Sequence, residues 1–129
     1  MDRTTERRLL QLSVAVASLV PILAGSAGII YGTGMMGAGG QPALDSHFRY
    51  LSGLLLGIGL AFAASVPAVA MHRRRFRLLC ATVVLGGVGR FISLLSSGNA
   101  GWPDLAALTM ELVVTPALTV WQQRMSAPT

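Results

Sequence analysis

The sequence predicts an all-α integral membrane protein, a single four-helix transmembrane bundle with both termini in the cytoplasm. Of its 129 residues, 53% are hydrophobic and only 12% are charged, whereas ordinary soluble domains contain about 25% charged residues. A membrane-spanning helix needs roughly 20 apolar residues, so the chain has room for about four spans within one domain over residues 1–129. We expect the spans at about residues 9–31, 48–71, 78–97 and 105–123.

The first expected span follows a basic start and in this respect resembles a secretory signal. Small residues at 24–27 would suit a cleavage site, but the apolar run continues beyond them. We therefore expect the segment to remain as the first transmembrane helix. The four-residue spacing of Ala24, Gly28 and Gly32 predicts a face of small residues for close helix packing.

The second expected span has a face that combines small and polar residues. Gly53 and Gly57 lie on the same side as Arg49 by helical spacing, and we expect this side to pack against another helix. The preceding residues 33–47 are rich in glycine and predict a long loop. Asp45, four residues before Arg49, would suit a helical ion pair if the helix begins early.

A basic cluster, HRRRFR at His72–Arg77, separates the second and third spans. Cytoplasmic loops retain arginine and lysine, so this cluster, the N-terminal arginines and Arg124 predict a cytoplasmic location. The turn at residues 98–103 would then face outward. The same side chains could instead bind anionic lipid headgroups, and both interpretations remain open for Arg73, Arg74, Arg75 and Arg77.

Two charges, Arg90 and Glu111, lie inside the third and fourth spans. Charged side chains in membrane helices are costly and usually pair with one another. At about 1.5 Å per residue, both lie roughly 10 Å below the outer end of their antiparallel helices. We therefore expect a direct or water-mediated interaction between them, with Asp104 as the N-cap of the fourth helix.

Further polar residues could extend this pair into a cluster. Ser93 shares a face with Arg90 by helical spacing, Arg49 is the expected third charged member, and Asp45 or His47 could close the group from above. One interpretation is structural.

A guanidinium that binds a carboxylate through two hydrogen bonds is self-contained and would fasten the third helix to the fourth. The other interpretation is a pocket. Two arginines against the single carboxylate of Glu111 would favour an anionic or lipid-like ligand, or Glu111 would relay protons.

Catalysis and cofactor binding are not expected. His47 and His72 lie at opposite ends of the second span, so no nucleophile and base can be paired, and we expect that the protein is not an enzyme. Neither histidine lies within an expected span and the six methionines are scattered, which argues against haem. No metal site is apparent, and the single Cys80 excludes an internal disulfide. Arginines at helix ends and 6% aromatic residues argue against nucleic acid as a partner.

Three segments carry a family resemblance: FRYLSGLLLGIGL (Phe48–Leu60), GGVGRFISLLSSG (Gly86–Gly98) and ELVVTPALTVWQQR (Glu111–Arg124). They resemble a bacterial family of small four-span membrane proteins known only as a domain of unknown function, which is distantly similar to the DoxX-like group. Some members of that group are associated with respiratory or redox complexes. The resemblance implies no activity, and it implies that the family's characteristic positions here are Arg49, Tyr50, Gly53, Arg90, Ser93, Glu111, Pro116 and Trp121.

These observations predict a multi-pass protein of the bacterial cytoplasmic (inner) membrane, with the lipid bilayer as its surroundings. We expect it to act as a structural or accessory subunit, either as a homo-oligomer or within a larger membrane complex. The alternative is a module that binds or transports a small anionic or lipid-like ligand through Arg49, Arg90 and Glu111.

Overall fold

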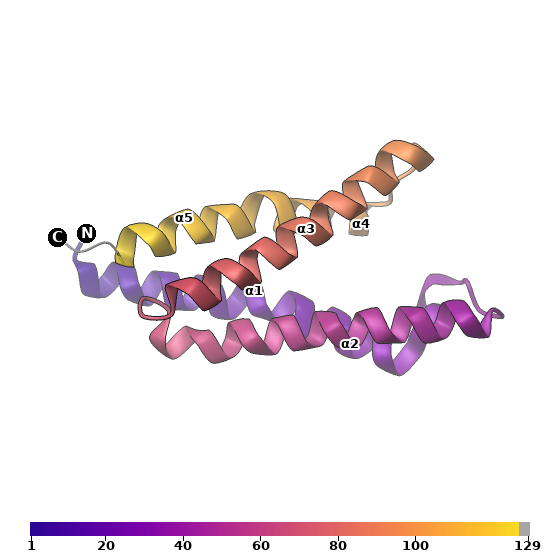
Figure 1. Cartoon of the computed structure of the whole chain (residues 1–129), viewed down its shortest axis with the longest axis horizontal. Coiled ribbons are helices and arrows are strands. Elements are labelled where there is room, and N and C mark those ends of the chain that lie inside the picture. Colours follow the sequence, from indigo (N-terminus) through magenta and orange to yellow (C-terminus); the bar gives the residue numbers. More distant parts are fainter. Residues whose placement is uncertain (127–129) are drawn as a thin grey trace. The chain divides into compact units, whose positions relative to one another are not determined.

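The computed structural model describes residues 1–126, and this range contains helices, turns and no strand (Figure 1). Four helical stretches are long and apolar enough to cross a membrane. They comprise Arg3–Met36, Pro42–Ala68, Arg73–Ser97 and Trp102–Ser126. The prediction of four long apolar helices is therefore confirmed, and their assembly into one bundle stays a prediction.

The individual elements are α-helices joined by short 3-10 or π-helical turns. In chain order they are α1 (Arg3–Tyr31), η1 (Gly32–Met36), α2 (Pro42–Ser65), η2 (Val66–Ala68), α3 (Arg73–Ser97), α4 (Trp102–Thr109), η3 (Met110–Val114) and α5 (Thr115–Ser126).

The expected loop over residues 33–47 is wrong, because α2 begins at Pro42. Proline suits the first turn of a helix since it has no N–H to leave unpaired there, and Asp45 adds a negative charge where the helix dipole favours one. Only residues 37–41 separate η1 from α2. Asp45 and His47 therefore lie on the helix and not in a loop.

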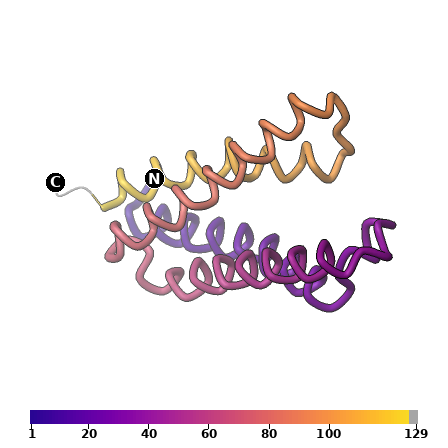
Figure 2. Tube along the Cα trace, turned by 45° about the vertical axis from the view of Figure 1, so that its right-hand side comes forward, coloured from indigo at the N-terminus to yellow at the C-terminus, as the bar shows by residue number. Residues whose placement is uncertain are grey.

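The helices form two compact units. The α1–α2 unit contains residues 12–67, and the α3–α5 unit contains residues 1–11 together with the chain from Ala68 onward. Figure 2 shows that α1 and α2 run antiparallel on either side of the η1 connection. Likewise, α3 runs antiparallel to the helix formed by α4, η3 and α5 (Figures 1 and 2).

Close contact between α1 and α2 depends on glycine. A Cβ atom on Gly25 would lie 2.6 Å from the backbone N of Leu56, and one on Gly59 would lie 2.9 Å from the backbone N of Ile22. Real Cβ atoms do not approach other atoms so closely, so the backbones could not keep this distance with any larger residue.

The predicted faces of small residues are displaced from the observed contact. Gly28 and Gly32 do face α2, but Gly25 is the third member and Ala24 is exposed. On α2, Gly57 is exposed with no atom near its Cβ position, whereas Gly59 is buried. Four-residue spacing alone could not distinguish between adjacent helical faces that both carry small residues.

The best-buried part of the α3–α5 unit lies where α5 meets the connection between α2 and α3. Leu10, Val69, Phe76 and Gln122 are each 1% exposed or less. The Gln122 side chain donates a hydrogen bond from Nε2 to the carbonyl of Val69 at 2.8 Å. It therefore satisfies a backbone carbonyl within an otherwise apolar contact.

Replacing Gln122 with alanine is expected to lower the free energy of unfolding by about 2–4 kcal/mol, because the change leaves a cavity and a buried carbonyl without its donor. Denaturant unfolding of the purified protein in detergent measures this loss. The matched control is Gln123→Ala on the adjacent exposed position, which should change stability by less than about 0.5 kcal/mol. Equal losses from the two variants would contradict the assigned burial of Gln122.

Candidate functional site

The predicted interaction between Arg90 on α3 and Glu111 on η3 is confirmed. Arg90 donates from Nε to Glu111 Oε2 at 3.1 Å and from Nη2 to Glu111 Oε1 at 3.4 Å. Its remaining nitrogen, Nη1, donates to Asp104 Oδ1 at 3.3 Å. One guanidinium therefore holds two carboxylates, and we call these three residues the Arg90 cluster.

Asp104 does not act as the predicted N-cap. Gly101 occupies that position, and no side chain caps the helix. Asp104 lies one turn further on, in the first turn of α4, and its carboxylate binds Arg90 instead. The carboxylate still lies near the positive end of the helix dipole, so the two interactions do not compete.

The local sequence brings α3 and the η3 turn close together. Gly98 ends α3 in a left-handed conformation with φ of 65°, which glycine adopts without steric cost, and the chain then returns antiparallel. Gly87 lies one turn before Arg90, and a Cβ atom there would sit 2.8 Å from Glu111 Cβ. The absence of a side chain at Gly87 lets Glu111 lie against α3 within reach of Arg90.

Glu111 lies within the π-helical turn η3 (Met110–Val114). At its end, the backbone N–H of Thr115 and the hydroxyl of Thr115, at 2.8 Å, both donate to the carbonyl of Met110. Pro116, the next residue, cannot donate a backbone hydrogen bond, so the regular ladder is already interrupted here. π-Helical turns such as η3 insert one extra residue into a helix and occur frequently at functional sites.

A cavity of about 360 Å³ adjoins the Arg90 cluster. Its polar lining comprises Arg90, Asp104, Ser93, Ser97 and Asn99. The volume falls at the lower end of the range typical of small-molecule sites. Ser93, a predicted site residue, therefore lies beside this space together with Arg90.

The two carboxylates of the cluster differ in their surroundings. The Glu111 side chain is 18% exposed and does not line the cavity, whereas the Asp104 side chain is 51% exposed and does. Glu111 therefore anchors Arg90 through two hydrogen bonds, while Asp104 makes a single contact at 3.3 Å and can be reached from the cavity.

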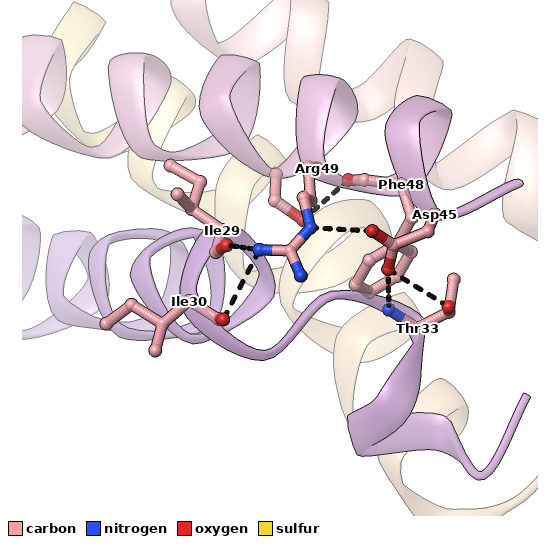
Figure 3. Close-up of polar contacts among 7 residues, drawn as sticks. Ile29, Ile30, Thr33, Asp45, Phe48 and Arg49 are labelled. Atoms are coloured by element: carbon pink, nitrogen blue, oxygen red, sulfur yellow. Dashed lines mark hydrogen bonds and ion pairs between the residues drawn. The ribbon is translucent and has the colours of Figure 1, made fainter. Parts of the chain in front are cut away.

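The second predicted arginine, Arg49, forms its own cluster in the α1–α2 unit (Figure 3). Its Nε donates to Asp45 Oδ2 at 2.7 Å, and its Nη1 donates to the carbonyls of Ile29 and, at 3.3 Å, Ile30. A positive charge on the last carbonyls of a helix is favoured by the helix dipole. Arg49 thus stabilises the end of α1.

Asp45 completes this second cluster from the opposite side. Its Oδ1 accepts hydrogen bonds from the backbone N–H of Thr33 at 2.8 Å and from the Thr33 hydroxyl at 3.1 Å (Figure 3). The expected helical ion pair of Asp45 with Arg49 is confirmed. His47 is exposed, and the proposed grouping of Arg49 with Arg90 and Glu111 stays a prediction, because the two clusters belong to separate units.

Replacing Asp45 with asparagine is expected to loosen η1, because Arg49 loses its ionic partner and Thr33 loses a charged acceptor. We expect a lower free energy of unfolding and faster hydrogen exchange at the Thr33 amide. Asp2→Asn, at an exposed position near the N-terminus, serves as the control. Unchanged exchange at Thr33 in the Asp45 variant would contradict the assigned hydrogen bond.

Charge in both clusters departs from the sequence-based expectation. Two arginines against the single carboxylate of Glu111 predicted an excess of positive charge, but Asp104 and Asp45 each add a carboxylate. With all groups ionised, the Arg90 cluster carries one positive and two negative charges. The Arg49 pair carries one of each.

The remaining predicted residues, Arg73, Arg74, Arg75 and Arg77, lie in the first two turns of α3 and are exposed. Sequence reasoning missed Asn99, which lies in the turn after α3 and lines the cavity. Ser97, the last residue of α3, also lines the cavity and shares the helical side of Arg90 by spacing, but it was not among the predicted site residues. Among residues 1–126, no group of three or more His, Cys, Asp or Glu side chains could hold a metal ion.

A family model described as a domain of unknown function, DUF4345, matches residues 9–122. No curated protein and no solved structure is detectably similar to the chain. The matched range includes both arginine clusters and most of each of the four long helices, and on this evidence the chain belongs to the DUF4345 family.

Proposed function

We propose that this protein is a multi-pass membrane protein that binds a small polar ligand in the cavity beside Arg90. The single observation that carries the proposal is that this cavity of about 360 Å³ is lined by charged residues, Arg90 and Asp104, on an otherwise apolar helix pair. Charges within apolar helices are costly and are usually associated with a ligand or ion pathway.

The lining suggests the chemistry of this ligand. Arg90 already binds two carboxylates, so an anion would compete for a guanidinium that is in use. Asp104 is the weakly held and exposed partner, and it can accept a hydrogen bond or face a positive charge. Ser93, Ser97 and Asn99 supply neutral hydrogen-bonding groups. We therefore propose a cationic or donor-rich ligand in place of the anionic ligand expected from the sequence.

Two glycines on α3 provide a matched test. Gly86 lines the cavity, Gly89 does not, and neither has an atom within 4 Å of its Cβ position. Leucine at either position should therefore fold equally well, but only Gly86→Leu should fill the cavity. We expect a small molecule to purify from bacterial membranes with the wild type and with Gly89→Leu, and mass spectrometry of the extracted ligand to show its loss from Gly86→Leu. Equal retention by all three proteins would contradict the proposed site.

We also propose that the protein resides in the bacterial inner membrane with both termini in the cytoplasm. The concentration of arginines near the N-terminus, at the start of α3 and near the C-terminus supports this orientation. Reporter fusions at both termini and after Gly98 should give a cytoplasmic signal at the termini and a periplasmic signal at Gly98. The reverse pattern would overturn the orientation.

A second candidate function is that of an accessory subunit. It is favoured by Gly57 and Gly89, which are exposed, have open space at their Cβ positions and so suit close packing against another helix. Native mass spectrometry in nanodiscs should then show an oligomer or a partner that is lost in Gly89→Leu. A wild-type monomer that keeps its fold would argue against this role.

A further inference from the structure

The end of the α3–α5 unit opposite the Gly98 turn is strongly basic. Glu6 Oε1 accepts a hydrogen bond from Trp121 Nε1 at 3.2 Å, which joins α5 to the start of α1. Ser126 donates to the carbonyl of Ala70 at 2.9 Å, which joins α5 to the residues before α3. Eight arginines lie at this end, in the first residues of α1, the first residues of α3 and the last residues of α5: Arg3, Arg7, Arg8, Arg73, Arg74, Arg75, Arg77 and Arg124.

These arginines have no acidic partner within residues 1–126. Every ion pair in that range involves Arg49 or Arg90, and the eight side chains are exposed. Only two acidic residues, Asp2 and Glu6, lie in the same stretches, so eight positive charges face two negative ones, a net charge of +6. Such a surface attracts anions.

The start of α3 concentrates this charge in an unfavourable place. Three consecutive arginines, Arg73, Arg74 and Arg75, occupy its first turn, which contains no acidic residue, and His72 provides no side-chain cap. The positive end of the helix dipole favours negative charge at this position and disfavours arginine. An anion bound here would be attracted by the guanidinium groups and by the dipole together.

A cavity of about 590 Å³ that is open to the surface lies at this helix start. Its polar lining comprises His72, Arg73, Arg74, Arg75 and Thr82, and its apolar lining comprises Met71, Leu78 and Leu79. Leu78 and Leu79 lie about one turn further along α3, so two apolar side chains follow the arginines along the helix axis. A free phosphate would use only the charged part.

We propose that this cavity binds an anionic phospholipid, with the phosphate at Arg73–Arg75 and the first part of an acyl chain against Leu78 and Leu79. The apolar α3 helix continues directly from the arginines, which matches the order of headgroup and chain in a lipid. Clusters of basic residues at the end of a membrane helix are typical of such recognition. The site is separate from the cavity beside Arg90 and does not depend on its function.

Lipid titration of the purified full-length protein in neutral detergent tests the proposal. Native mass spectrometry should show that phosphatidylglycerol or cardiolipin binds at least about tenfold more tightly than phosphatidylcholine. This ratio corresponds to a difference of about 1.4 kcal/mol in binding free energy. Arg74→Gln combined with Arg75→Gln should remove most of this preference. Arg7→Gln combined with Arg8→Gln removes the same charge outside the cavity and should leave the preference within about twofold.

Three results would overturn the proposal. Equal affinity of the wild type for anionic and neutral lipid would leave the arginines with a role in orientation alone. Equal losses in the two double variants would indicate general surface charge. Full displacement of the lipid by millimolar inorganic phosphate would identify phosphate as the ligand. Because the affinities are measured on purified protein in detergent, a change of membrane orientation in a variant cannot affect the result.

Discussion

Replacing Gly25 with leucine is expected to separate α1 from α2 and to lower the free energy of unfolding by about 3 kcal/mol or more. Even a Cβ atom at this position would lie 2.6 Å from the N and 2.9 Å from the Cα of Leu56, and 2.7 Å from the carbonyl oxygen of Ser52. These are backbone atoms, which cannot rotate away as a side chain can. Overpacking of ordinary cores costs about 1–3 kcal/mol, and a contact between two backbones is less adaptable.

Gly57→Leu provides the control for this prediction. Gly57 also lies within a long apolar helix, but no atom lies within 4 Å of its Cβ position. Removing a glycine from a helix interior generally stabilises the helix by about 0.5–1 kcal/mol, so this variant should be at least as stable as the wild type. Thermal unfolding in detergent gives both values, and a similar melting temperature for the two variants would show that the α1–α2 contact is not as close as described.

Replacing Glu111 with glutamine is expected to destabilise the α3–α5 unit more than replacing Asp104 with asparagine. Glutamine offers one acceptor oxygen, and its amide group would face the guanidinium of Arg90, so the two hydrogen bonds at 3.1 and 3.4 Å cannot both persist. We expect a loss of about 2 kcal/mol, typical of a hydrogen bond to a charged group.

The Asp104→Asn change should cost about 0.5 kcal/mol, because its single contact of 3.3 Å is half exposed and exposed ion pairs contribute little. Denaturant unfolding of both variants under identical detergent and salt conditions measures the difference. Equal losses, or a larger loss for Asp104→Asn, would contradict the assignment of Glu111 as the anchor of Arg90.

The four long helices could be predicted from the sequence because apolar composition and length determine membrane-spanning potential almost alone. The boundaries of the helices could not all be predicted from the sequence. The glycine-rich residues 33–47 predicted a loop, but Pro42 starts a helix within them, and the hydrogen bonds of Asp45 to Thr33 hold the preceding turn in place. Long-range side-chain contacts of this kind leave no periodic signal.

The candidate site could be predicted in part for a similar reason. Matching depths on antiparallel helices were sufficient to pair Arg90 with Glu111, which depends only on the rise per residue. The role of Asp104 was missed because a residue one turn into a helix has two plausible partners, the helix N-terminus and the facing helix. A pocket was one of the two interpretations that the sequence left open, but its volume and lining could not be predicted, since empty space depends on side-chain packing and not on sequence pattern.

The central proposal, a polar cavity beside Arg90 that is open to water, can be tested most directly by cysteine labelling in intact cells. In a Cys80→Ala background, Ser93→Cys places a thiol in the cavity lining. The control, Ile92→Cys, places a thiol at the adjacent exposed position, which does not line the cavity. We predict that a membrane-impermeant maleimide modifies Ser93→Cys from outside the cell at least about tenfold faster than Ile92→Cys, a difference of 1.4 kcal/mol. Equally slow modification of both positions would show that Arg90 and Glu111 form an ion pair that joins the two helices without access to water, and would contradict the proposed ligand site.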